Sequence, residues 1–225
     1  MCFFNAQNKR ALTIANRYGR RSDIIEMARE IIEEQKVQKA FLHPECYIVT
    51  NNEQLQSAEW GLIPFWVRDA QKAKIIRKTT ANAKAETAFT LPSFREAIKK
   101  RRCLIPSTGF YEYHHEGKEA IPYQIILRDT ELFSLAGIYE NWQNPDTKEI
   151  KRTFSVLTVP ANALCMFIHN GGSNPGRMPA ILTREDEAQW INPNMNEAGI
   201  KALLRPYEST LMDARALEKD FLRRA

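Results

Sequence analysis

Apolar residues recur every three to four positions in two segments of the first hundred residues, which predicts amphipathic helices. The first segment covers residues 22–40. Its apolar stripe consists of Ile24, Ile25, Ala28, Ile31 and Ile32. The second covers residues 91–102 and has Ser93 and Glu96 in capping-box spacing. A strand is expected between the two helices, over residues 46–50.

Beyond residue 102 the apolar spacing changes to alternation, which predicts strands separated by turn-like segments such as EGKE and NPDT. The expected strands cover residues 103–115, 121–127, 132–139, 152–160 and 177–182. Helices are expected over 161–168, 183–191 and 196–204. Strand runs with helices set between them predict one α+β domain over residues 1–225, built around a mainly antiparallel, twisted or barrel-like sheet.

Composition narrows the class of protein. The 225 residues are 44% hydrophobic and 26% charged, as in an ordinary folded protein, and the net charge of +5 favours anionic partners. No apolar run reaches the ~18 residues of a membrane span, and no secretory signal is present, so we expect a cytoplasmic protein. Four cysteines lie far apart without the short spacing of zinc ligands. We therefore expect no metal and no cofactor.

Cys2 follows the initiator methionine directly. Removal of Met1 would leave an α-amine with a pKa of about 8 beside a thiol. Such an amine attacks an aldehyde to give an imine, and the thiol can close onto the imine carbon to form a five-membered thiazolidine. A lysine imine lacks this second step. The alternative is an ordinary cysteine at an unimportant terminus, and Cys2 taken alone does not decide between the two.

Glu112 lies in the segment GFYEYHHEG, where strand alternation places Phe110, Glu112 and His114 on one face. A carboxyl group among aromatic neighbours can have a raised pKa and act as a general acid and base near neutral pH. The alternative is a solvent-facing glutamate on an edge strand.

Two further polar residues occupy positions that suit a site. His169 follows an apolar segment and precedes glycines, a placement typical of a histidine that projects into a cleft and transfers protons. Asn82 could orient a substrate or the Cys2 amine. A structural histidine and an asparagine in a turn are the alternatives.

Basic and aromatic residues are interleaved before and after Asn82. Cationic grooves with aromatic platforms hold single-stranded nucleic acid through phosphate contacts and base stacking. A solvated surface is the alternative. Trp60 is expected in the core and Trp66 on the surface as the platform. The basic residues are Lys72, Lys74, Arg77, Lys78, Lys84 and the run Lys99–Arg102.

Five motifs in register resemble the SRAP family, the abasic-site processing proteins once described as SOS-response-associated peptidases. They are the initial Met-Cys, WGLIPFW, NAKAET, STGFYEY, and a histidine followed by RMPAIL. The resemblance covers nearly the whole chain. It implies the SRAP fold and a role in DNA damage repair, in which the protein binds single-stranded DNA and cross-links reversibly to abasic sites.

The same resemblance implies roles for four residues. Cys2 would be the nucleophile that forms a thiazolidine with the sugar aldehyde, and Asn82 would position the reacting terminus. Glu112 would shuttle protons, and His169 would assist sugar opening. An accompanying autopeptidase or lyase activity belongs to this expectation, as does a monomer that joins the nucleoid when it is bound to DNA.

The DNA contacts implied by the resemblance include Lys84 at the position of a phosphate-binding arginine, Arg177 in the Arg-Met-Pro motif, and Thr158 near the lesion. Trp66 and Arg77 complete the expected DNA-binding set as the platform and a basic residue of the groove. The chain departs from the family in two places. Phe3 and Phe4 replace a usual Gly-Arg pair, and residues 170–176 separate His169 from Arg177.

Two other functions are compatible with the sequence. One is a cysteine peptidase or amidase in which Cys2 attacks a carbonyl, His169 is its base, and Met1 is removed autoproteolytically. The other is a non-catalytic nucleic-acid-binding module, whose binding would depend on salt and survive the loss of Cys2.

Overall fold

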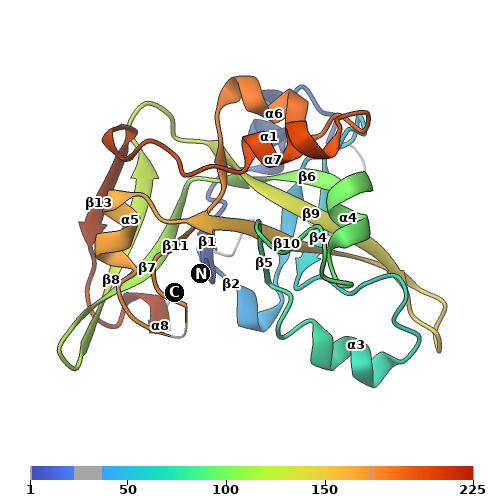
Figure 1. Ribbon diagram of the computed structural model, residues 1–225, viewed down its shortest axis with the longest axis horizontal. Helices are drawn as coiled ribbons and strands as arrows, with labels where there is room; N and C mark the ends of the chain where they lie inside the picture. The colour runs from blue at the N-terminus through green and yellow to red at the C-terminus, as the bar shows by residue number, and fades with distance from the viewer. Residues whose placement is uncertain (1, 23–36, 173, 225) are drawn as a thin grey trace.

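The strands form two open, twisted sheets (Figure 1). The structure is a computed structural model and describes residues 2–22, 37–172 and 174–224. The first sheet has the order β13-β8-β7-β1-β2. Its members are β1 (Phe4–Ala6), β2 (Gln38–Lys39), β7 (Gly109–Glu116), β8 (Glu119–Leu127) and β13 (Met212–Ala216). All of their pairings are antiparallel.

The second sheet has the order β12-β9-β10-β4-β3, and three more strands pair with β9 or β10. Its members are β3 (Glu45–Ile48), β4 (Gln56–Trp60), β5 (Asn82–Lys84), β6 (Arg102–Ser107), β9 (Phe133–Gln143), β10 (Ile150–Pro160), β11 (Arg177–Pro179) and β12 (Ile181–Leu182). Two pairings are parallel, those of β10 with β4 and with β5. The α+β fold with mainly antiparallel sheets is thus confirmed. The strands of the described residues do not close into a barrel.

Short helices cover the sheets. In Figure 1, α1, α6 and α7 gather at the top, and an ion pair between Arg17 of α1 and Glu187 of α6 joins two of them. None of the helices in the described residues is long and apolar enough to cross a membrane. The helices are α1 (Ala11–Arg17), α3 (Ala70–Ile76), α4 (Arg95–Lys100), α5 (Ala163–Ile168), α6 (Arg184–Trp190), α7 (Glu197–Leu203) and α8 (Phe221–Arg224), with 3₁₀ turns η1 (Ala40–Leu42) and η2 (Ser209–Leu211).

The expected helices of the C-terminal half begin at recognisable caps. The side chain of Thr183 accepts a hydrogen bond from the Asp186 amide at α6, and Asn196 accepts one from the Gly199 amide at α7. Such caps satisfy backbone amides that have no partner within the helix. The helix expected over residues 22–40 falls mostly outside the described residues, and its last part contains the strand β2 instead.

The capping box expected at Ser93 is wrong. The helix α4 begins at Arg95, with Phe94 in the N-cap position and no side-chain cap. Phe94 is buried in the main core, and turn hydrogen bonds from the Phe94 and Arg95 amides to the Leu91 carbonyl precede the helix. A backbone turn and a buried phenylalanine thus precede this helix in place of a side-chain cap.

Arg102 is not part of a basic surface, contrary to the expectation for the run Lys99–Arg102. Its side chain is buried and donates to four backbone carbonyls. These belong to Ile98 and Lys99 in α4, to Trp190 at the end of α6, and to Asn192 beyond it. Carbonyls at helix ends have no partner within the helix, so one guanidinium satisfies two helix ends at once.

Trp60 lies in the core, as predicted. Its ring stacks on Phe154 with centroids 5.7 Å apart, and its indole N–H donates to the Ala81 carbonyl at 2.8 Å. These contacts join β4 to β10 and to the residue just before β5. The parallel pairing that follows sets Asn82 opposite Val156 and Lys84 opposite Thr158.

Candidate active site

Cys2 is held where the two sheets meet. Pairing of β1 with β7 sets Phe4 opposite Tyr111. Because the strands are antiparallel, Glu112 lies next to the residues that precede β1. From the second sheet, the Asn82 side chain donates to the Cys2 carbonyl at 2.9 Å. Cys2 is fully buried. The two pairings therefore fix the N-terminal segment from both sides.

Asn82 has unused hydrogen-bonding capacity at this position. Its amide oxygen is buried, and within the described residues no hydrogen-bond donor reaches it. A buried acceptor without a partner costs about 1–3 kcal/mol and is uncommon. The oxygen is therefore available to an N–H or O–H group that enters the site.

Glu112 and His169 form a buried pair across β7 and the end of α5. The imidazole Nε2 lies 3.9 Å from the Glu112 Oε2. The imidazole Nδ1 lies 3.0 Å from the Arg177 carbonyl, to which it can donate, and 3.4 Å from the Arg177 amide, which can donate to it. The shorter contact is to the carbonyl and favours the tautomer with the proton on Nδ1. Nε2 then carries the lone pair on the side of Glu112. A carboxylic acid and a proton acceptor thus lie next to each other.

Burial sets the protonation states of this cluster. Burial raises the pKa of Glu112 to about 8, and it lowers the pKa of His169 below its ordinary value. The pKa of the Cys2 thiol is raised, first by burial and next by the negative charge of Glu112. At neutral pH the cluster therefore holds a largely protonated carboxyl, a neutral imidazole and a thiol, which together can donate and accept protons around one reacting carbon.

The structure brings all four predicted residues, Cys2, Asn82, Glu112 and His169, into this one cluster. It also adds Cys165, which sequence reasoning missed. Burial, and next the charge of Glu112, raise the pKa of the Cys165 thiol to about 12. A signal was present, because Cys165 and His169 are four residues apart and a helix places such residues on one face.

Arg177 is engaged by protein groups. Its guanidinium donates to both carboxylate oxygens of Glu86, at 2.6 and 2.9 Å, and to the Thr158 carbonyl at 2.6 Å. Thr158 is fully buried, and its hydroxyl accepts from the same guanidinium at 3.2 Å. A phosphate would have to compete with Glu86 for this arginine. Lys84, by contrast, is exposed beside Thr158 on β5.

The other two residues of the expected DNA-binding set lie around α3. The Trp66 side chain is 44% exposed, and its indole N–H donates to the Pro92 carbonyl at 3.2 Å. Its ring lines an apolar pocket with Ile75 and Ile76. The guanidinium of Arg77 is paired with Glu59 at 2.7 Å and is mostly buried. The structure therefore presents Trp66 to solvent but holds Arg77 in an ion pair.

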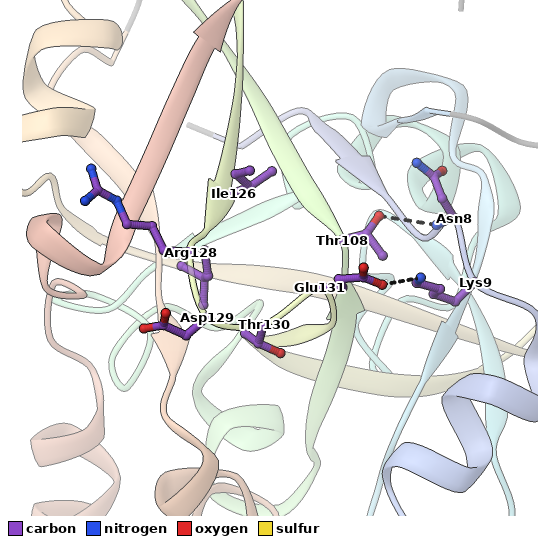
Figure 2. A pocket seen from close by; sticks show the side chains of 9 residues that line it. Asn8, Lys9, Thr108, Ile126, Arg128, Asp129, Thr130 and Glu131 are labelled. Carbon is purple, nitrogen blue, oxygen red and sulfur yellow. Dashed lines mark hydrogen bonds and ion pairs between the residues drawn. The ribbon is translucent and has the colours of Figure 1, made fainter.

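A separate pocket of about 570 Å³ opens at the turn between β8 and β9 (Figure 2). Its walls come from that turn and from the segment after β1, and they include an ion pair between Lys9 and Glu131 at 2.7 Å. None of the predicted site residues lines it. No group of three or more histidine, cysteine or acidic residues in the described residues could hold a metal ion.

The chain is similar to a known protein family, to named relatives and to a solved structure. The family model of the SOS response associated peptidases (SRAP) matches residues 1–222. The chain is 38% identical over 166 residues to the abasic site processing protein YoqW of Bacillus subtilis, covering 73% of this chain and 69% of YoqW. It is 28% identical over 176 residues to the abasic site processing protein HMCES of Gallus gallus, covering 69% of this chain and 50% of HMCES. A crystal structure of a protein from Bacteroides thetaiotaomicron has a TM-score of 0.96 and 46% identity, covering 100% of this chain and 95% of that one.

Proposed function

Because this chain belongs to the SRAP family, we propose that it processes abasic sites in DNA by forming a covalent, reversible cross-link through Cys2. The observation that carries the proposal is the buried cluster itself. Asn82 holds the Cys2 carbonyl at 2.9 Å, and the acid–base pair of Glu112 and His169 lies beside it. Removal of Met1 supplies the free α-amine that the chemistry requires.

The residues of the cluster fit each step of this reaction. His169 takes the proton of the C1′ hydroxyl as the sugar opens and returns it to the ring oxygen, which leaves C1′ as the C4′ hydroxyl. The Cys2 amine adds to the C1′ aldehyde to form a carbinolamine. Glu112 donates a proton to its hydroxyl group, so water leaves and a protonated imine remains, with Glu112 as the carboxylate.

Ring closure to the thiazolidine then restores the protonated state of Glu112. The Cys2 sulfur bonds to the carbon of the protonated imine, and the thiol proton passes to the Glu112 carboxylate, which restores its acid form. The nitrogen keeps its own proton and becomes a neutral amine. The net change is the loss of one water molecule. Because the thiol has a raised pKa, it needs a base next to it, and Glu112 occupies that position. The reverse sequence releases the DNA.

The substrate in this proposal is single-stranded DNA. Lys84 and Trp66, both exposed, would contact a phosphate and a base. Arg177 would take part once a phosphate displaces Glu86, and Thr158 would act through its contact with Arg177. Arg77, although paired with Glu59, would contribute to the positive electrostatic potential that attracts the DNA. We expect one domain acting as a monomer in the cytoplasm, and these points stay predictions.

A peptidase reaction is less well supported. A cysteine nucleophile in a peptidase needs a lowered thiol pKa, usually from a neighbouring imidazolium. Here burial, and next the charge of a Glu112 carboxylate, raise the pKa of Cys2, and His169 has a lowered pKa. Lyase and autopeptidase activities are therefore secondary to cross-linking in our proposal.

Intact-protein mass spectrometry tests the proposal directly. The protein is mixed with single-stranded DNA that carries one abasic site. We expect a chain lacking Met1 and a new species whose mass equals protein plus DNA less one water. DNA with a tetrahydrofuran in place of the abasic sugar has no aldehyde and serves as the control. A protein that retains Met1, or that forms no adduct with the aldehyde-bearing DNA, would overturn the proposal.

Replacing Glu112 by glutamine is expected to slow adduct formation at pH 7 by about 100-fold, the usual contribution of one positioned acid–base group. Because the pKa of Glu112 is about 8, its acid form is depleted above that pH, and the wild-type rate should fall there. The glutamine variant should lack this fall. Single-turnover rates between pH 6 and 10 provide the comparison.

The same substitution has a stability readout that separates catalysis from folding. The pKa of Glu112 is raised from 4.5 to about 8 in the folded protein, so the unfolded chain releases this proton first as pH rises. Wild-type stability should therefore fall between about pH 4.5 and 8 through this group, and the variant should not show that part of the fall. A variant that does not fold would assign Glu112 a structural role instead.

A further inference from the structure

An exposed apolar turn lies directly beside the N-terminal strand. Phe41 and Leu42 of η1 are 60% and 67% exposed, although both are large and apolar. The turn ends at His43, which has a left-handed backbone with φ of 54°, and Pro44 follows. A backbone conformation that is unusual outside glycine thus fixes the end of this turn.

The Phe41 ring belongs to a chain of aromatic contacts. Its ring meets the ring of Phe4 edge to face with centroids 5.9 Å apart, and Phe4 meets Tyr113 in the same way at 6.1 Å. Phe4 packs on a second buried cluster that includes Tyr111. We refer to Phe4, Phe41, Leu42 and Tyr113 as the aromatic shelf. Its inner members are held by the fold, and its outer edge, Phe41 and Leu42, faces solvent.

The shelf is close to Cys2. Phe4 is two residues from Cys2, so their Cα atoms are at most about 7 Å apart. The turn is also tied to this segment, because the Ala40 amide donates to the Phe3 carbonyl at 2.9 Å and Lys39 pairs with Phe4. Figure 1 shows η1 beside the N-terminus, next to β2. The inner edge of the shelf at Phe4 therefore lies within about 7 Å of Cys2, and Phe41 contacts that edge.

An aromatic and aliphatic edge cannot hold a phosphate, but it can stack a base. At an abasic site the neighbouring bases have lost one stacking partner, so their exposed faces are available. We propose that the aromatic shelf stacks the base next to the abasic site and takes the place of the missing base. Phe41 is the outer stacking residue and Phe4 its support. This inference rests on the proposed function and extends it to the choice of flanking nucleotide, with purines stacking best.

Photo-cross-linking tests the contact itself. Single-stranded oligonucleotides carry one abasic site and a 5-iodouracil at the first, second or third position on either side. After irradiation, peptide mass spectrometry is expected to find a cross-link to Phe41 from one of these positions. Cross-links confined to Trp66 and Phe65 would overturn the proposal, because the platform would then lie near α3. The covalent adduct at Cys2 is recorded in the same sample, so failure of the proposed function, in which no adduct forms, is distinguished from failure of the shelf, in which the adduct forms without a photo-cross-link to Phe41.

Substitutions test how much the aromatic shelf contributes to the affinity for abasic DNA. The substitution Phe41→Ala is expected to weaken binding of the abasic oligonucleotide by about 5- to 100-fold, the range measured for loss of one base–aromatic stack. The substitution Phe41→Tyr should restore binding. Ile150→Ala, at a residue 68% exposed at the start of β10, is the matched control and should leave binding unchanged. Equal affinities for wild type and Phe41→Ala would overturn the proposal, and so would an equal loss in the Ile150 variant.

Discussion

Replacing Cys2 by serine is expected to lower the denaturation-resistant adduct with abasic DNA by about 100-fold or more, because the closing bond to sulfur is lost rather than weakened. The serine variant keeps its α-amine and can still form the imine. An imine hydrolyses when the protein is denatured, so little adduct should survive on a denaturing gel. Borohydride reduces an imine to a stable amine, and its addition before denaturation should bring the adduct back.

This pair of results separates the two nucleophiles of Cys2. Cys46→Ala is the matched control, since Cys46 is equally buried but lies in β3, and it should cross-link like the wild type. A serine variant that gives a stable adduct without borohydride would show that the thiol is dispensable. No adduct even with borohydride would mean that the amine does not reach the aldehyde.

Replacing Arg102 by methionine is expected to lower the free energy of unfolding by at least about 3 kcal/mol. Methionine has similar length but no donors, so four carbonyls at or just beyond the ends of α4 and α6 lose this donor. The Asn192 carbonyl still accepts from the Met195 amide, and each buried carbonyl left unsatisfied costs about 1–3 kcal/mol. Relaxation of the helix ends recovers part of this sum. For a chain of this size the midpoint of thermal unfolding should fall by about 6–12 °C.

Lys100→Met in the same helix is the control for this effect. Lys100 is exposed and, among the described residues, is seen to pair with Glu96 one turn earlier, so its loss should change stability by no more than about 0.5 kcal/mol. Urea unfolding of both variants gives the comparison. Arg102→Met with wild-type stability would mean that water or rearranged backbone satisfies the four carbonyls.

Local patterns predicted the parts of the fold that depend on neighbours in sequence. Alternation in residues 110–114 placed Glu112 and His114 on one face, and both meet α5 or the residue that ends it. Thr183 and Asn196 cap helices that began within a residue of their expected positions. Such features need only the strand or helix repeat and a side chain that reaches its own backbone.

Long-range pairing could not be predicted in the same way. The parallel pairing of β5 with β10 brings Asn82 to Cys2, and it joins segments about 75 residues apart with no local signal. The three-residue strand β1 is too short to show alternation. Arg102 looked like surface charge because its partners are carbonyls of two helix ends, which no spacing of residues reveals. The chemistry-bearing residues were recognisable, but only tertiary structure shows that they meet.

The long separation in sequence between β1 and β7 also affects when the N-terminal segment can fold during synthesis. Phe4 finds its partner Tyr111 more than a hundred residues later, so until then the first residues of a growing chain have only the two-residue strand β2 to join. At about 5–20 residues per second, roughly 5–20 s pass before that partner is synthesised. Throughout this interval Met1 can be reached by an aminopeptidase working at the ribosome. Late burial of Cys2 therefore lets the start of the chain be trimmed first and enclosed afterwards.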